Sequence, residues 1–88
     1  MNKAEARKLV VNILDEKTQV MNSATLSPQL RNPEADLPMS ALELDSLEQV
    51  DISMEIEVRT GLNFDLAELA QAQSLNDLAA HIARRMEG

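Results

Sequence analysis

Phe64 is the only aromatic residue in this chain of 88 residues, and the sequence contains no cysteine. A hydrophobic core must therefore be built from Leu, Ile, Val, Ala and Met side chains, without a disulfide to support it. Leu and Ala favour helix over strand, and only two glycines and three prolines are present to interrupt helices. A chain this short buries about 60–65% of the surface that its unfolded form exposes. We therefore expect one all-α domain covering residues 1–88.

Four segments show the apolar spacing of an amphipathic helix, with apolar residues at positions i, i+3, i+4 and i+7. The first helix is expected over residues 3–20. The second is expected to begin at residue 45 or 46 and to end before Gly61, a residue type that suits a helix C-terminus. A short third helix is expected over residues 66–71, and a fourth over residues 75–86. Capping boxes are predicted before the last two helices, from Asp65 with Glu68 and from Ser74 with Asp77.

The connection between the first two helices, residues 21–44, is unusually long for a compact domain. It is too apolar for a disordered tail, so we expect it to pack across the bundle. Ser27-Pro28 suits an N-cap followed by the first residue of a short helical turn. The apolar residues in this connection are Leu26, Leu30, Leu37, Met39, Leu42 and Leu44.

The net charge is −7, and the acidity is concentrated in one part of the chain. Residues 32–58 contain eight carboxylates and no Lys or Arg, whereas residues 1–17 contain four bases and three acids. A nucleic-acid-binding protein needs a basic surface, so this class is excluded. The acidic stretch favours protein partners with basic patches and salt-sensitive encounter. A surface that serves only solubility is the alternative.

The sequence offers no chemistry of its own. His81 is the only histidine and lies within a helix, where a packed or solvated role is usual, and no G-x-S-x-G motif is present. The acids do not follow the spacing of a calcium-binding loop, so neither a metal site nor an enzyme is expected. No apolar run approaches the length of a membrane span, and the N-terminus has no signal-peptide core. We expect a cytoplasmic protein without a membrane partner.

The tripeptide Asp45-Ser46-Leu47 lies where the long connection meets the second helix. Asp45 can cap this helix, with Glu48 completing a capping box. Ser46 then becomes the first helical residue, with its hydroxyl pointing outward at the positive end of the helix, where an anion is favoured. A serine in this position suits a point of covalent attachment. The alternative is an ordinary serine at a helix start.

The second helix carries apolar residues on two faces. Leu47, Val50, Met54 and Val58 fall on one stripe, and Ile52 and Ile56 fall on the opposite side. One helix cannot bury both faces in so small a core, so one of them must be exposed. The pattern alone favours the larger stripe as the buried face.

The Asp45-Ser46-Leu47 tripeptide, the acidic helix after it, the chain length and the helix order together resemble the acyl carrier proteins, over about residues 4–86. The resemblance implies a four-helix bundle in which a phosphopantetheinyl transferase attaches 4′-phosphopantetheine from coenzyme A to Ser46. The terminal thiol of this group would then hold an acyl chain as a thioester, for fatty-acid or polyketide biosynthesis. Met39 and Leu62 could line the space between the second and third helices that shelters the chain.

The resemblance reverses the assignment of the two faces of the second helix. It implies that Ile52 and Ile56 are buried and that the larger stripe, with its acidic rim, meets the partner enzymes. These partners are the transferase and acyl-loading and acyl-processing enzymes with basic patches, acting on a monomeric carrier. The implied contact residues are Leu47, Glu48, Val50, Asp51, Met54, Glu55 and Glu57.

Three positions depart from the family pattern. Glu43 stands where the family usually has a glycine, Val58 where an acid is common, and Thr60 where an aromatic residue is common. The residues before Ser46 also lack the Gly-Gly-His typical of peptidyl carriers, which favours a fatty-acid or polyketide type. The departures suit a carrier dedicated to one specialised pathway. Two alternatives stay open, a discrete aminoacyl or peptidyl carrier and an acidic interaction module in which Ser46 is never modified.

Overall fold

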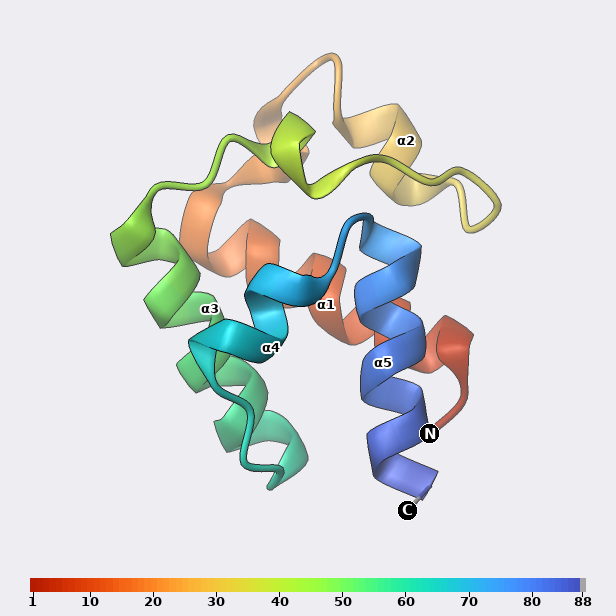
Figure 1. Ribbon diagram of the computed structural model, residues 1–88. Helices are drawn as coiled ribbons and strands as arrows, with labels where there is room; N and C mark the ends of the chain where they lie inside the picture. Colours follow the sequence, from red (N-terminus) through yellow and green to blue (C-terminus); the bar gives the residue numbers. More distant parts are fainter. Residues whose placement is uncertain (88) are drawn as a thin grey trace.

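The computed structural model describes residues 1–87, which form α-helices and two short 3₁₀ helices with no β-strand in this range (Figure 1). The α-helices are α1 (Lys3–Thr18), α2 (Ser27–Arg31), α3 (Ser46–Thr60), α4 (Leu66–Gln71) and α5 (Leu75–Glu87). The 3₁₀ helices are η1 (Val20–Asn22) and η2 (Met39–Leu42). The all-α class is confirmed. The four expected helices correspond to α1, α3, α4 and α5, and α2 is the short turn expected near Ser27-Pro28.

The core lies between α1 and the helices that pack on it. α1 packs most extensively against α5 and next against α3, and α4 packs against α3. In Figure 1, α1 crosses behind α4 and α5, with α3 on the left. None of the helices in residues 1–87 is long and apolar enough to cross a membrane. The largest fully buried side chains are Phe64, Ile13, Leu14, Ile52, Ile56, Leu75, Leu78, Ile82 and Val10.

Two predicted helix termini are shifted. The first helix ends at Thr18 rather than Val20, because Gln19 adopts the left-handed conformation at φ 58° and its N–H bonds back to the Asp15 carbonyl. The chain then turns through η1, which buries Val20. Ser27 is the first residue of α2 rather than its N-cap, which is Leu26, and no side chain caps this helix.

The capping boxes differ between the last two helices. Asp65 and Glu68 form the predicted reciprocal box at the start of α4. At α5 only one half of the predicted box is present, because Ser74 Oγ accepts from the Asp77 amide whereas the Asp77 carboxylate accepts from the Gln73 amide. Ser74 also pairs with Pro38 in an isolated antiparallel bridge.

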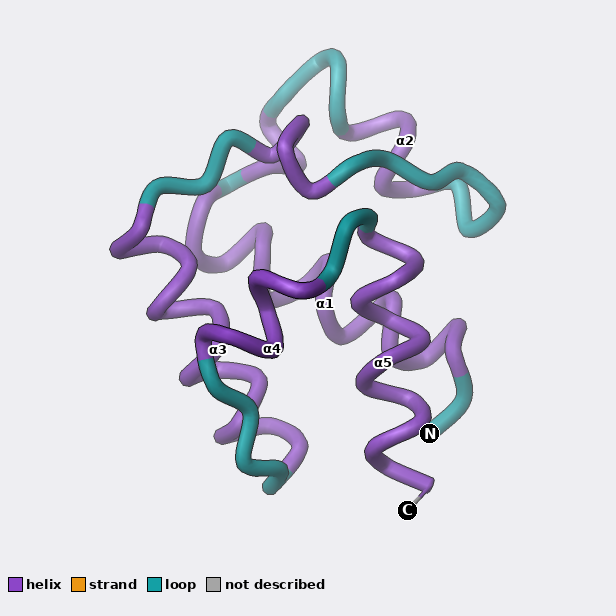
Figure 2. Tube along the Cα trace, in the orientation of Figure 1, coloured by secondary structure: helices purple, strands orange, loops and turns teal. Residues whose placement is uncertain are grey.

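The long connection crosses the bundle, as predicted (Figure 2). It buries Leu30, Leu37 and Leu42 in the core. Its second half is fixed to the start of α5, where the Leu75 amide donates to the Leu37 carbonyl at 3.0 Å and the Met39 amide donates to the Gln73 carbonyl at 2.9 Å. These contacts fix η2, and with it the point at which the chain enters α3.

Arg7 fixes the first half of the connection, and nothing in the sequence pattern predicted this role. Its side chain is only 7% exposed and has no carboxylate partner among the described residues. Its guanidinium donates to the carbonyl oxygens of Gln29, Leu30 and Ala35 and to the Asn76 side chain, at 2.8–3.2 Å. The rigid fork of donors suits this task, because the carbonyls of Gln29 and Leu30 in the last turn of α2, and of Ala35 in the loop after it, have no donor within α2.

Candidate functional site

The chain enters α3 through a tight turn at the end of η2. Glu43 adopts the left-handed conformation, with φ 51° and ψ 43°, and its amide donates to the Ser40 carbonyl at 3.2 Å. This region of backbone space favours glycine, because a Cβ is crowded there. The structure thus gives a physical reason for the glycine that resembling proteins usually have at this position.

Asp45 and Glu48 form the predicted capping box of α3. The Asp45 carboxylate accepts from the Glu48 amide at 2.7 Å, and the Glu48 carboxylate accepts from the Asp45 amide at 3.1 Å. Asp45 itself has extended backbone geometry, with φ −79° and ψ 173°. The box fixes where the helix begins, so that Ser46 is its first residue.

Ser46 is exposed, and its hydroxyl makes no hydrogen bond within residues 1–87. The amides of Ser46 and Leu47 also donate to no acceptor in this part of the chain, since the first bonds of α3 are those of Glu48 and Gln49. The site therefore combines an accessible hydroxyl with two free N–H groups at the positive end of a helix of 15 residues. A negatively charged group attached to this hydroxyl would be stabilised there.

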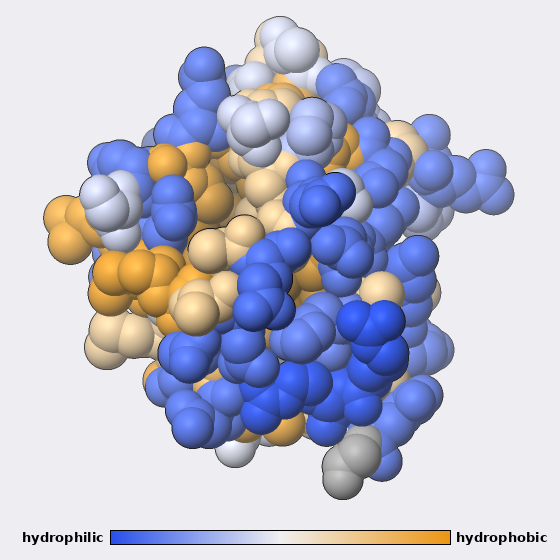
Figure 3. Space-filling view, in the orientation of Figure 1, coloured by the Kyte–Doolittle hydropathy of each residue, from blue (hydrophilic) through white to orange (hydrophobic). Residues whose placement is uncertain are grey.

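The two apolar faces of α3 have opposite environments. Ile52 and Ile56 are fully buried, whereas Leu47 is 73%, Met54 58% and Val58 77% exposed, and Val50 lies at the margin of the same strip at 36%. The smaller stripe is therefore the buried one, as the resemblance implies, and not the larger stripe that the pattern alone favours. Figure 3 shows apolar atoms gathered on the side of the molecule where α3 lies. We name Leu47, Val50, Met54 and Val58 the outer strip.

The acids near the outer strip differ in whether they have a hydrogen-bond or ion-pair partner within the fold. Asp51 is exposed and has no hydrogen-bond or ion-pair partner among the described residues. Glu55 is half-buried and lies 3.8 Å from both Lys17 and Arg59, so it links α3 to the end of α1. Glu57 accepts from the Phe64 amide at 2.9 Å and supports the turn after α3. Glu48 is held in the capping box. Among these four acids, Asp51 alone is both exposed and without a partner in residues 1–87.

A partly open pocket of about 320 Å³ lies beside the start of α3, between η2 and α4. Met39 lines it, as predicted, but Leu62 does not, because Leu62 lies in the turn at the far end of α3. Gln49 bridges its edge by donating to the Leu44 carbonyl at 3.1 Å. The sequence did not identify Gln49 or the α4 residues, since their role depends on how η2 and α4 approach each other. The remaining lining residues are Ser40, Glu43, Leu44, Leu69, Ala70 and Ala72.

The comparison with protein families gives a match to the phosphopantetheine attachment site family over residues 10–82. The chain belongs to this family. It is therefore a phosphopantetheine carrier, and domains of this kind bear covalently attached 4′-phosphopantetheine. Such carriers interact with a phosphopantetheinyl transferase and with biosynthetic enzymes. Neither curated proteins nor solved structures gave a match to the chain.

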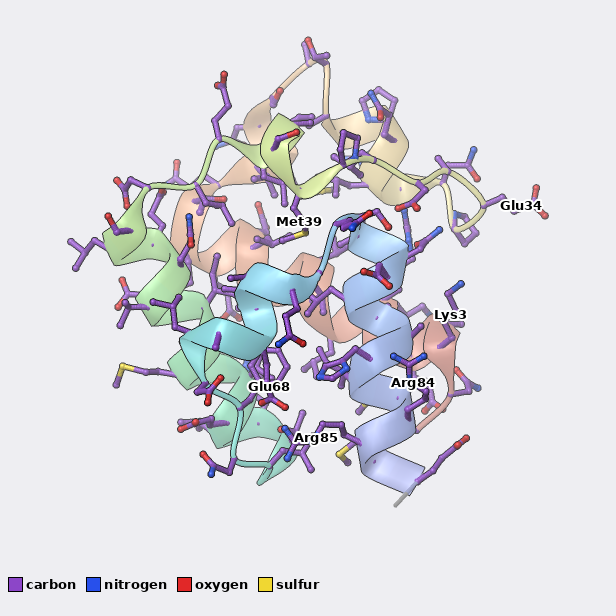
Figure 4. All side chains as sticks on the ribbon, in the orientation of Figure 1. Lys3, Glu34, Met39, Glu68, Arg84 and Arg85 are labelled. Carbon is purple, nitrogen blue, oxygen red and sulfur yellow. The ribbon has the colours of Figure 1, made fainter. Side chains whose placement is uncertain are left out.

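Carrier domains of this family are generally non-catalytic. Within residues 1–87, no three metal-ligating side chains come together. His81 is half-buried and its ring packs edge-on against Phe64, with 6.0 Å between the ring centroids. Its Nε2 lies 3.5 Å from Glu68, which also pairs with Arg85 (Figure 4). His81 therefore belongs to the packing between α4 and α5.

Proposed function

We propose that Ser46 is the attachment residue and that this chain carries acyl intermediates as thioesters. The observation that carries the proposal is the environment of Ser46, an exposed hydroxyl with no competing partner beside two free amides. The geometry suits the group, because its phosphodiester is an anion and the start of α3 favours negative charge. When bound, the group supplies a terminal thiol, which this cysteine-free chain lacks.

The residues around Ser46 have separate tasks in this proposal. Asp45 and Glu48 fix the first turn of α3, so Ser46 presents its oxygen to the transferase at a defined position. Leu47 is exposed directly beside it and would make the first apolar contact with that enzyme. The pocket lined by Met39, Leu44 and Leu69 lies close enough to the start of α3 to shelter an acyl chain.

The outer strip is the proposed docking surface for partner enzymes. A contiguous row of exposed apolar side chains rimmed by polar residues is typical of a surface that contacts another protein. Met54 and Val50 would provide apolar contact, and Asp51 would steer basic partners toward it. Glu48, Glu55 and Glu57 already serve contacts within the fold, so they would contribute mainly to the negative field. We propose that the carrier serves a specialised fatty-acid or polyketide pathway as a cytoplasmic monomer.

Labelling with a fluorescent coenzyme A analogue and a broad-specificity transferase tests the attachment residue. We expect Ser46→Ala to abolish labelling, and Ser40→Ala to leave it unchanged because Ser40 is an exposed serine in the short 3₁₀ helix η2 and not at the start of an α-helix. Fragment mapping of the labelled protein should place the group on the peptide that contains Ser46. Labelling of Ser46→Ala at another serine would exclude the proposal.

The alternative is a discrete aminoacyl carrier, since the fold alone does not select the thioester-bound group. Loading of the phosphopantetheinylated carrier by acyl-transferring enzymes, compared with loading by amino-acid-adenylating enzymes, distinguishes the two. We expect the acyl-transferring enzymes to be the more effective, because Met39, Leu44 and Leu69 give the pocket beside the start of α3 an apolar part that an acyl chain can occupy. Loading by the adenylating enzymes alone would establish the aminoacyl type.

A further inference from the structure

A second surface depression lies on α1 and α2, with a volume of about 560 Å³ and a largely apolar lining. Its apolar surface comes from Ala4 and Val11 of α1, Met21 of η1, Leu30 of α2 and Pro33. The α1 residues that line it lie between Lys3 and Asn12, a length of about 14 Å along the helix at 1.5 Å per residue. We name this depression the α1–α2 groove.

All the charged residues that line the α1–α2 groove are basic, namely Lys3, Arg7, Lys8 and Arg31. Half of the eight Lys and Arg residues of a chain with fifteen acids thus border one depression, and no carboxylate lines it. Three acids lie nearby without lining the groove. Glu34 points outward from the loop after α2, away from the bundle (Figure 4). The carboxylates of Asp15 and Asp36 accept from the amides of Met21 and Asn76, and the charge of Lys3 acts on Asp36. The lining itself therefore has the opposite charge to the protein as a whole.

Three of these cations are available to a partner. Arg7 is buried and already donates to three carbonyl oxygens and to the Asn76 side chain. Lys3, Lys8 and Arg31 are exposed and form no ion pair or side-chain hydrogen bond within residues 1–87. Lys3 and Lys8 are separated by about 7.5 Å along α1, and Arg31 stands on a different helix. Their separation suits a ligand that carries several spaced negative charges.

The groove also lies away from the proposed attachment site. Figure 1 shows α2 and the first half of α1 on the right of the molecule, whereas α3 lies on the left. None of the groove residues belongs to α3. A partner in the groove would leave Ser46 and the outer strip free.

We propose that the α1–α2 groove binds an acidic amphipathic helix of a partner protein. The apolar stripe of such a helix would lie on Val11, Met21 and Leu30, and flanking carboxylates would pair with Lys3, Lys8 and Arg31. Beyond about 8 Å, exposed charges are largely screened at physiological ionic strength, so the groove cations outweigh the net negative charge locally. This proposal does not depend on modification of Ser46.

Two other occupants fit the groove less well. A small amphipathic anion such as a fatty acid carries a single carboxylate, which could pair with only one part of the spread cations. A second copy of this chain could present its acidic α3, but two molecules of net charge −7 repel each other as they approach. An acidic amphipathic helix can contact the apolar residues of the groove and also pair with its three separated cations.

The test uses a fluorescein-labelled peptide with leucines on one helical face, flanked by glutamates, and about 15 residues long so that a helix can form. Anisotropy measures its affinity, and amide chemical shifts locate it on the intact protein. We expect saturable binding with shifts centred on residues 3–12 and 27–33. Lys8→Glu should weaken binding at least about tenfold, because it reverses a charge at the contact. Ser46→Ala should bind like the wild type.

Arg84→Glu is the matched control. Arg84 is exposed on α5, outside the groove, and forms no ion pair among the described residues, so its reversal makes the same change in net charge. We expect this variant to weaken binding by less than about twofold at physiological salt. Equal weakening by Arg84→Glu and Lys8→Glu would overturn the proposal, because net charge alone would then govern binding.

Three further results would also overturn the proposal. A scrambled peptide of the same composition that binds equally well would show that the apolar stripe is not recognised. Saturable binding of decanoate in the groove without binding of the peptide would identify a small-anion site. Self-association of the carrier that Lys8→Glu abolishes would identify a second copy of the chain as the occupant.

Discussion

Glu43 shows how one backbone conformation can matter beside a functional residue. It lies in the left-handed region at φ 51°, three residues before Ser46, with its side chain exposed. The turn there directs the chain from η2 into α3, so the position of Ser46 depends on a conformation that glycine adopts more easily. The family pattern has a glycine at this position, and the left-handed conformation observed here also favours glycine, whereas this chain has Glu43.

Glu43→Gly should therefore stabilise the carrier by about 0.5–1 kcal/mol, since it removes the crowding of Cβ in the left-handed region. Denaturant titration measures the change in the free energy of unfolding. Glu43→Gln is the control, because it removes the same charge but keeps the Cβ. Stabilisation of equal size in both variants would assign the effect to charge rather than to backbone strain.

Asp36 supplies a pH-dependent contact between the long connection and α5. Burial raises the pKa of Asp36. Hydrogen bonds from the Asn76 amide, the Ser74 side chain and the Leu37 amide, together with the charge of Lys3, lower this pKa by more than burial raises it. The net pKa therefore lies below the ordinary value of 3.8. The contact contributes stability that is present above pH 3.8 and is lost as the pH falls through the lower, folded-state pKa.

Asp36→Asn should lower the melting temperature at pH 7, because it replaces a charged acceptor at the first turn of α5 by a neutral one. The difference from wild type should shrink as the pH falls below 3.8, where the wild-type carboxylate also becomes protonated. Melting curves of both proteins between pH 7 and pH 2 measure this. Glu34→Gln, a charge loss in the same loop, should show no such convergence, and an Asp36→Asn difference that is constant with pH would contradict the assignment.

At the scale of the element, α3 is the helix whose two faces the pattern alone assigned wrongly, since it favoured the larger stripe as the buried face. Both faces are apolar, and the larger one is exposed because α1 and α4 pack against the face with Ile52 and Ile56. The helix positions themselves could be predicted, since the periodicity, Gly61 and the boxes at Asp45 and Asp65 each act within a few residues. The role of Arg7 could not be predicted, because its carbonyl partners lie 22–28 residues away, in the last turn of α2 and in the loop after it.

Ile56→Ala should cost about 2–4 kcal/mol of the free energy of unfolding, because it leaves a cavity in the core. Met54→Ala, on the outer strip, should cost less than about 0.5 kcal/mol. It should instead slow loading by the transferase, through lost apolar contact at the proposed docking surface. Denaturant titration and initial loading rates separate the two effects. Unchanged loading of Met54→Ala would remove Met54 from the proposed docking surface.

At the scale of the whole molecule, charge repulsion opposes the compact state. The net charge is −7, and the ion pairs within residues 1–87 engage three of the fifteen acids, namely Glu16, Glu55 and Glu68. Exposed ion pairs contribute about 0–1 kcal/mol each, so salt should weaken the repulsion more than it weakens these contacts. The concentration of acids in residues 32–58 was evident from the sequence, whereas the pairing of Glu55 depended on the approach of α1 to α3.

Added sodium chloride or millimolar divalent cation should therefore raise the melting temperature of the carrier. The acidic stretch lies mostly on the surface, where screening is most effective. Melting curves recorded from low to physiological salt measure the effect. A melting temperature that stays flat or falls would mean that salt weakens the ion pairs at least as much as it weakens the repulsion between the unpaired acids.

The attachment of one phosphopantetheinyl group to Ser46 is tested most directly by the intact mass of the protein after incubation with coenzyme A and a broad-specificity transferase. Wild type should gain the mass of one group, and Ser46→Ala should gain none while keeping near-native helicity, because its exposed hydroxyl makes no hydrogen bond within residues 1–87. A wild type that stays unmodified, or a Ser46→Ala variant that gains the group, would contradict the account.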